Sequence, residues 1–208
     1  MQIILHKNAT LVAVSKTKSI DEIRMVYDCG QKFFGENKVQ EIILKQKELP
    51  QDIKWHMIGH LQTNKVKLIA PFISLIESVD SEKLLAEISK EAQKNIRTID
   101  CLLEIKIAKE ETKYGLNLSE AKKIIEKYRN NLFPGIRICG LMGIATDTDD
   151  RETTRAEFKG LFELYKEFKK LKFEGFEILS MGMSGDYELA IEEGSNMVRI
   201  GSAIFGKR

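Results

Sequence analysis

The sequence predicts an α/β fold, and within that class a single (β/α)8 barrel. Short apolar segments alternate with segments of helical periodicity along the whole chain, which is typical of repeated β-α units on a parallel sheet. No glycine-rich turn follows the first apolar segment, whereas segments rich in glycine and serine follow the last two. Open doubly wound sheets bind ligands after the first strand, and barrels commonly bind phosphate after strands seven and eight, so the barrel is favoured.

Eight strands are expected, each a short run of apolar and β-branched residues. Their ranges are 10–16, 32–37, 54–60, 74–79, 98–108, 136–145, 176–184 and 197–205. Little sequence precedes the first strand or follows the last, so the barrel is expected to be a minimal one.

Seven helices are expected between these strands. Ser19-Ile-Asp-Glu22 is a capping box, and the helix that it opens is expected to stop at Gly30. Residues 119–128 place apolar side chains on one helical face, and residues 157–172 carry an aromatic stripe that we interpret as core packing. Residues 146–150 lack the Gly and Glu of a calcium loop and are interpreted as a helix start.

Composition favours one soluble domain over residues 1–208. The 33 Lys and Arg residues nearly balance and alternate with the 31 Asp and Glu residues, which favours neither nucleic acid nor a membrane surface as a partner. No apolar stretch approaches the roughly 20 residues of a membrane span, and the N-terminal apolar run is too short for a signal peptide. We therefore expect a cytoplasmic protein, and the charged helix faces favour a monomer.

Cysteines and histidines give no signal for a metal or a disulfide. Cys29, Cys101 and Cys139 are odd in number and lack Cys-x-x-Cys spacing, so we expect three small core residues. His56 and His60 share a face of the third expected strand. Without a carboxylate or a third ligand nearby, these two histidines do not predict a metal site.

Lys16 ends the first expected strand, in phase with Val12 and Val14. Side chains alternate between the interior and the helix layer along a barrel strand, and functional groups lie at the carboxyl ends. Lys16 is therefore expected to point inward at the mouth of the barrel, where an amine is placed to add to an aldehyde. The alternative is a surface lysine just past the strand, because lysine is rarely buried without a partner.

Arg199 interrupts the apolar strand Met197-Val-Arg-Ile-Gly201. A buried guanidinium is costly unless other groups accept its hydrogen bonds. One explanation is a structural ion pair, and the other is that Arg199 faces the pyridine nitrogen of a bound cofactor. A fixed cation there would oppose protonation of that nitrogen and make the ring a weaker electron sink.

The segments after the last two strands contain candidates for holding an anion. Ser184, Gly185, Gly201 and Ser202 supply hydroxyls and accessible amides, and a helix expected to begin near Asp186 adds its free amides. Glycine and serine also mark ordinary turns, so each segment alone is weak evidence. An anion cradle together with a lysine at the same rim indicates pyridoxal phosphate.

Asn37 lies at the carboxyl end of the second expected strand. Two roles are open for its side chain. It is placed either to hydrogen-bond a ring substituent of the cofactor or to cap the helix that follows.

Seven motifs occur in order along the chain. They are Ala13-Val-Ser-Lys16, Phe34-Gly-Glu-Asn37, Trp55-His-Met-Ile-Gly-His-Leu-Gln62, Lys113-Tyr-Gly-Leu116, Gly140-Leu-Met-Gly-Ile144, Ser180-Met-Gly-Met-Ser184 and Val198-Arg-Ile-Gly-Ser-Ala-Ile-Phe-Gly206. With these motifs the chain resembles the pyridoxal phosphate homeostasis protein family, whose members are relatives of the N-terminal barrel of alanine racemase. The resemblance runs from about Leu11 to Gly206 and implies a fold type III barrel that binds pyridoxal phosphate.

The resemblance also implies roles for individual residues. Lys16 would be the internal aldimine lysine, Arg199 the partner of the pyridine nitrogen, Met142 a neighbour of the ring and Asn37 a contact at its edge. The implied phosphate binders are Ser184, Gly201 and Ser202. A protein of this family is expected to bind the cofactor, keep its free aldehyde low and deliver it to apo-enzymes.

Two features depart from the family pattern. Family members begin with a helix before the first strand, so this chain is expected to have a truncated N-terminal helix and a more open flank. Lys106 stands where a neutral polar residue is expected and would project into the barrel beside Glu104. It either pairs with that carboxylate or acts as a second amine that accepts the aldehyde.

Three functions are compared. A non-catalytic carrier of pyridoxal phosphate is favoured, because Arg199 weakens the electron sink and no second domain with an opposing acid or base is expected after Arg208. The first alternative is a single-domain amino-acid racemase that depends on pyridoxal phosphate. The second is a Schiff-base aldolase in which Lys16 attacks a sugar phosphate held by the same cradle.

Overall fold

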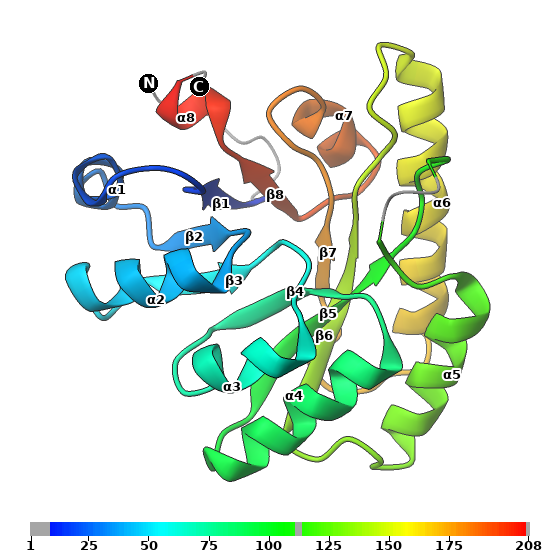
Figure 1. Cartoon of the computed structure of the whole chain (residues 1–208). Helices are drawn as coiled ribbons and strands as arrows, with labels where there is room; N and C mark the ends of the chain where they lie inside the picture. The colour runs from blue at the N-terminus through cyan, green and yellow to red at the C-terminus, as the bar shows by residue number, and fades with distance from the viewer. Residues whose placement is uncertain (1–8, 111–113, 207–208) are drawn as a thin grey trace.

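The computed structural model describes residues 9–110 and 114–206, in which eight parallel strands close into a barrel in chain order (Figure 1). Each strand pairs with the next, and β8 pairs with β1. The strands are Thr10–Val14 (β1), Phe33–Glu36 (β2), Lys54–Met57 (β3), Leu75–Val79 (β4), Ile99–Ile105 (β5), Ile136–Gly143 (β6), Ile178–Ser180 (β7) and Met197–Ile200 (β8). The predicted (β/α)8 fold class is confirmed.

Helices follow the strands and surround the barrel (Figure 1). They are Ile20–Asp28 (α1), Val39–Glu48 (α2), Val66–Ile69 (α3), Glu82–Lys94 (α4), Leu118–Arg129 (α5), Arg151–Lys169 (α6), Tyr187–Glu192 (α7) and Ser202–Phe205 (α8), and a 3-10 turn, Thr63–Lys65, precedes α3. Among the described residues, none of these helices combines the length and the apolar character needed to cross a bilayer.

Local signals explain where the helices begin. The capping box of Ser19 and Glu22 is present in both directions and opens α1, which ends just before Gly30 with a φ of 96° at that glycine. The side chain of Asp150 caps α6, so residues 146–150 lead into a helix as predicted. That helix begins at Arg151, directly after this segment, and contains most of the aromatic stripe expected over residues 157–172.

The eighth strand is shorter than expected, because the chain turns at Gly201. The expected strand 197–205 ends at Ile200, and residues 202–205 form α8. The amides of Ile204 and Phe205 both donate to the Gly201 carbonyl, which converts the extended run into a helical turn. The apolar residues of this turn gave no periodicity long enough to tell a helix from a strand.

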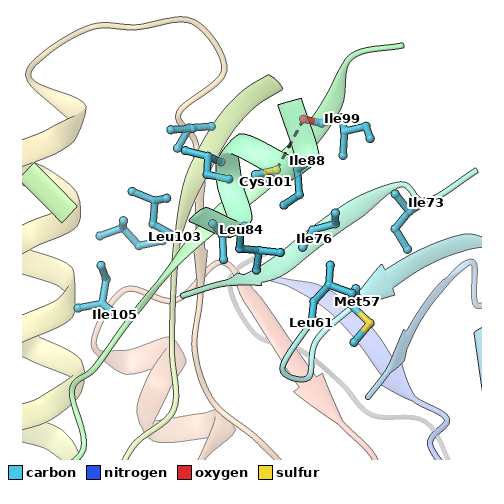
Figure 2. Packing of buried hydrophobic residues seen from close by; sticks show 14 of the residues in the cluster. Met57, Leu61, Ile73, Ile76, Leu84, Ile88, Ile99, Cys101, Leu103 and Ile105 are labelled. Carbon is cyan, nitrogen blue, oxygen red and sulfur yellow. Dashed lines mark hydrogen bonds between the residues drawn. The ribbon is translucent and has the colours of Figure 1, made fainter. Parts of the chain in front are cut away.

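Alternation along the strands divides the buried side chains into two layers. The barrel interior holds the cluster Val12, Leu75, Leu102, Cys139, Met142 and Met197. The larger cluster lies between the strands and the helices, and Figure 2 shows part of it, including Leu84 and Ile88 of α4 against Cys101 and Leu103 of β5. Successive residues of β5 thus face opposite layers, and Glu104 falls in the same phase as the interior residue Leu102.

The cysteine prediction is correct for two residues and wrong for the third. Cys101 and Cys139 are buried in the two layers, whereas Cys29 is exposed. Cys29 caps the carboxyl end of α1, and a residue at that end of an outer helix faces solvent.

Candidate functional site

A cavity of about 310 Å3 opens at the carboxyl ends of β1, β7 and β8, and we call it the first cavity. Its lining residues are Val14, Lys16, Lys18, Met183, Ser184, Gly185, Arg199, Gly201, Ser202 and Gly206. In the β1–β8 pairing, Val12 lies opposite Arg199 and Ala13 opposite Ile200. Lys16 and Gly201, from opposite ends of the chain, therefore lie at the same rim of the barrel.

Lys16 is partly buried at this rim, and buried polar contacts anchor the residue before it. The hydroxyl of Ser15 donates to Glu36 at 2.6 Å, and Lys45 Nζ donates to the Ser15 carbonyl at 2.9 Å and to Glu36 at 2.7 Å. Burial raises the pKa of Glu36 against the opposing effect of Lys45 and Ser15. These contacts lie on the helix side of the strand, so the next side chain, Lys16, faces the interior mouth.

The predicted anion binders converge in the first cavity. The Gly201 amide donates to Ser184 Oγ at 3.2 Å, and Gly201 is the N-cap of α8, so the amides that begin this helix have no helical acceptor. A Cβ at Gly201 would lie 3.3 Å from the side chain and the carbonyl of Val14, whereas one at Gly185 would meet nothing within 4 Å. Hydroxyls, free amides and an open glycine suit a phosphate group.

One cation in the first cavity was not predicted. Lys18 Nζ donates to the Phe205 carbonyl and to Glu22, both at 3.1 Å, and thereby ties the end of α8 to α1. Only its position two residues after Lys16, in the same phase, could have indicated it. The helix expected near Asp186 is α7, which has six residues, and Asp186 accepts the Met183 amide at 2.6 Å.

Arg199 is 3% exposed and lines the first cavity. Its Nη1 donates to Ser180 Oγ at 2.6 Å, its Nη2 donates to the Gly143 carbonyl at 2.9 Å, and Glu77 Oε2 lies 3.8 Å from Nη1. The structural ion pair that the sequence left open is therefore present. The ion pair is compatible with the other explanation, in which Arg199 faces the pyridine nitrogen of a cofactor, because the same guanidinium borders the cavity.

Glu77 links this arginine to a buried histidine. Its carboxylate accepts the hydroxyl of Ser180 at 2.6 Å and His56 Nδ1 at 2.7 Å. Burial by itself would raise the pKa of Glu77. The pKa is nevertheless lowered, because the carboxylate accepts hydrogen bonds from His56 and Ser180 and lies near the charges of His56 and Arg199. We call these four residues the interior network. Glu77 was missed because no local pattern marks it, and Ser180, which opens the sixth motif, was given no role.

The interpretation of the two histidines needs correction. β3 ends at Met57, so His56 and His60 do not share a strand face, and each has a carboxylate partner. His56 bonds Glu77, and His60 Nδ1 lies 2.7 Å from Asp80. The described residues contain no group of three His, Cys, Asp or Glu side chains that could hold a metal ion.

A second cavity of about 240 Å3 opens at the carboxyl ends of β2, β3, β5 and β6, and Asn37 lies in its wall. The capping role left open for Asn37 is wrong, because Lys38 is the N-cap of α2 and no side chain caps that helix. Met142 is completely buried in the barrel interior and lines neither cavity, whereas Ile144, on the same face, lines the second. The contact between Met142 and the ring therefore stays a prediction.

Lys106 and Glu104 also line the second cavity. Lys106 is exposed just past the end of β5, and Glu104 is buried, so the two lie beside each other at the rim and Lys106 does not enter the core. Lys113 of the fourth motif and the segment before β1, where the truncated helix was expected, lie outside the described residues.

The comparisons with known proteins agree with this architecture. The alanine racemase N-terminal domain family matches residues 1–208. The pyridoxal phosphate homeostasis protein of Aquifex aeolicus is 43% identical over 201 residues, which cover 96% of this chain and 87% of that protein. The human protein of the same name is 41% identical over 210 residues, with 95% and 76% covered.

A solved relative shows the same fold. The structure of PipY from Synechococcus elongatus without pyridoxal phosphate gives a TM-score of 0.89 at 33% identity and covers 97% of this chain and 94% of that one. Its structure with pyridoxal phosphate bound gives 0.86 at the same identity and coverage. The chain thus belongs to the alanine racemase N-terminal domain family and, within it, to the pyridoxal phosphate homeostasis proteins.

Proposed function

We propose that this protein binds pyridoxal phosphate in the first cavity and acts in its homeostasis as a carrier, without turning over a substrate. The observation that carries the proposal is the convergence of a lysine, an arginine and an anion cradle on one rim. The names of its relatives and the pyridoxal phosphate bound to PipY support the choice of ligand.

Five residues of the first cavity and Asn37 of the second have proposed parts in holding the ligand. Bound pyridoxal phosphate supplies an aldehyde that a lysine amine holds covalently. Lys16 would offer that amine, and Ser184, Gly201 and Ser202 would hold the phosphate. Arg199 would face the ring nitrogen, and Asn37, in the wall of the second cavity, would lie at the edge of the ring.

The proposed absence of turnover is supported by the positive charge expected at the ring nitrogen. The Arg199 guanidinium is held by Ser180, Gly143 and Glu77, so it stays in place and stays charged. A fixed cation keeps a proton off the ring nitrogen, and an unprotonated ring withdraws electrons weakly. We further propose that the protein is a cytoplasmic monomer and that its recipients are apo-enzymes that use pyridoxal phosphate.

Borohydride trapping tests the ligand and the lysine together. The purified protein should absorb in the visible range, and reduction followed by peptide mapping should place a pyridoxyl group on Lys16. Lys16→Ala should lose both signals, while Lys123→Ala, which changes an exposed lysine of α5, should keep them. An adduct on another lysine in the unaltered protein would show that the assignment is wrong.

The same experiment tests the second amine. Residual adduct in Lys16→Ala that disappears when Lys106 is also replaced would assign that role to Lys106. Absence of residual adduct would count against it.

Deuterium exchange tests the absence of turnover. Incubation of the loaded protein with alanine in deuterated water should leave the α-proton in place. Exchange above the rate of free pyridoxal phosphate would favour the single-domain racemase instead.

A further inference from the structure

The second cavity holds a carboxyl group for which the structure provides no partner. Glu104 is 6% exposed and lines this cavity with Asn37, Gly59, His60 and Tyr114. Across the described residues, 9–110 and 114–206, the Glu104 side chain makes no hydrogen bond and no ion pair. Buried polar side chains in proteins nearly always have such partners, and a buried carboxylate without one is costly.

Two neighbouring groups that carry hydrogen-bond donors, His60 and Arg199, are engaged with other partners. His60 Nδ1 is 2.7 Å from Asp80, and its ring stacks on Tyr114 with the centroids 4.1 Å apart. Arg199 donates to Ser180 and Gly143. The carboxyl group therefore faces the cavity as an acceptor with free capacity.

The charges around Glu104 set the pH at which it ionises. Burial is the main cause and the negative charge of Asp80 adds to it, so the pKa of Glu104 rises from 4.5 to about 7, with Arg199 acting in the opposite direction. The other titratable groups that border the cavity are His60, Lys106 and Tyr114. A cation brought close to Glu104 would favour its charged form and be bound more tightly as the pH rises.

We propose that the second cavity binds a small primary amine in its ammonium form, with Glu104 as the anionic acceptor. An ammonium group presents three donors and no acceptor, which complements a carboxylate that lacks donors. A volume of about 240 Å3 equals about eight water molecules at roughly 30 Å3 each, which is room for an amine with a short carbon chain. The ligand lies beside Asn37, at the end of the strand that pairs with β1.

The proposal is tested by adding propylamine to the protein as purified and measuring its binding by saturation-transfer NMR. Propylammonium should bind several-fold better at pH 8 than at pH 6, with a midpoint near 7. Glu104→Gln should weaken binding at pH 8 at least tenfold and remove the pH dependence. Glu126→Gln, which changes an exposed residue of α5, should leave both unchanged.

Two further variants separate Glu104 from its neighbours. Asp80→Asn should lower the midpoint, because the charge that raises the pKa of Glu104 is removed. His60→Gln should retain a midpoint near 7. Binding that is equal in Glu104→Gln and the unaltered protein, or a midpoint lost with His60, would overturn the proposal.

Two controls separate this binding from the chemistry of the first cavity. Propanol, which has the same size without the charge, should not bind, and equal binding of propanol would overturn the ammonium assignment. The visible spectrum should stay unchanged while propylammonium binds. Binding that occurs only together with a spectral change, and is lost in Lys16→Ala, would place the amine at the cofactor and overturn the proposal.

Discussion

Glu77 and Glu104 lie on the neighbouring strands β4 and β5, and within residues 9–110 and 114–206 only Glu77 has partners for its charge. Glu77 is completely buried, with His56, Ser180 and Arg199 around it, and its pKa is lowered. Glu104 is nearly as buried at the rim, and its pKa is raised to about 7. The same side chain thus serves as a counter-ion in the interior and as an open acceptor at the mouth.

The difference arises from where each carboxyl group meets the other strands. Inside the closed barrel, β3, β7 and β8 each bring one polar side chain to Glu77. At the rim the strands diverge into loops, and space remains beside Glu104 for a ligand. Both candidate sites lie at this rim, where functional sites of such barrels are found.

Glu77→Gln should have the largest effect on stability. Removal of one partner from a buried ion pair leaves the other charge uncompensated, and we expect a loss of about 3 to 5 kcal/mol in the free energy of unfolding. Urea unfolding at pH 8, monitored by circular dichroism, measures this loss in the free energy of unfolding. Glu104→Gln is the matched control and should not destabilise the protein at this pH. A loss below about 1 kcal/mol for Glu77→Gln would remove the distinction between the two carboxylates.

The contributions of Glu77 and Glu104 to the free energy of unfolding should change in opposite directions as the pH rises. Glu104 has a folded pKa of about 7 against 4.5 for its ordinary value, so its contribution is present below 4.5 and is lost as the pH rises through 7. That rise corresponds to at most about 3 kcal/mol. The lowered pKa of Glu77 means that its contribution is present above 4.5 and is lost at lower pH.

Unfolding of the unaltered protein and of Glu104→Gln at pH 5 and pH 8 measures the Glu104 contribution. The unaltered protein should lose stability relative to the variant between these values. A difference between the two proteins that does not change with pH would show that Glu104 is not perturbed.

Gly201 and Gly185 of the first cavity also differ in the space around them. Substitution of these glycines should have a smaller effect than substitution of Glu77. A Cβ at Gly201 would meet Val14 at 3.3 Å, whereas a Cβ at Gly185 has nothing within 4 Å. Gly201→Ala should therefore weaken the binding of pyridoxal phosphate about tenfold, or about 1.4 kcal/mol, by shifting the cradle. Fluorescence titration of Gly201→Ala and of the control Gly185→Ala with the cofactor measures this change in affinity. Equal affinities would mean that the packing at Gly201 does not shape the cradle.

Much of the candidate site could be predicted from the sequence, because the predicted lysine and anion binders of the first cavity follow strands that the local pattern identifies. Lys16, Ser184, Gly201 and Ser202 could be assigned to one rim once the strands were counted as a closed ring. Interior contacts were not accessible in this way. Glu77 and Ser180 are far apart in sequence, and their pairing with Arg199 depends on strand register across the barrel.

By itself the sequence determined the eightfold alternation of strands and helices, the position of Lys16 just after the first strand and the glycine and serine residues after the last two strands. The two-residue period of strands and the 3.6-residue period of helices involve residues that are close in sequence, so both can be recognised in the sequence alone. Only the tertiary structure decided that Glu77 has His56, Ser180 and Arg199 as partners, that Met142 is buried in the barrel interior and that Glu104 has no side-chain partner among the described residues. Those outcomes depend on distances between side chains of different strands and on their separation from water, which the closure of the barrel establishes.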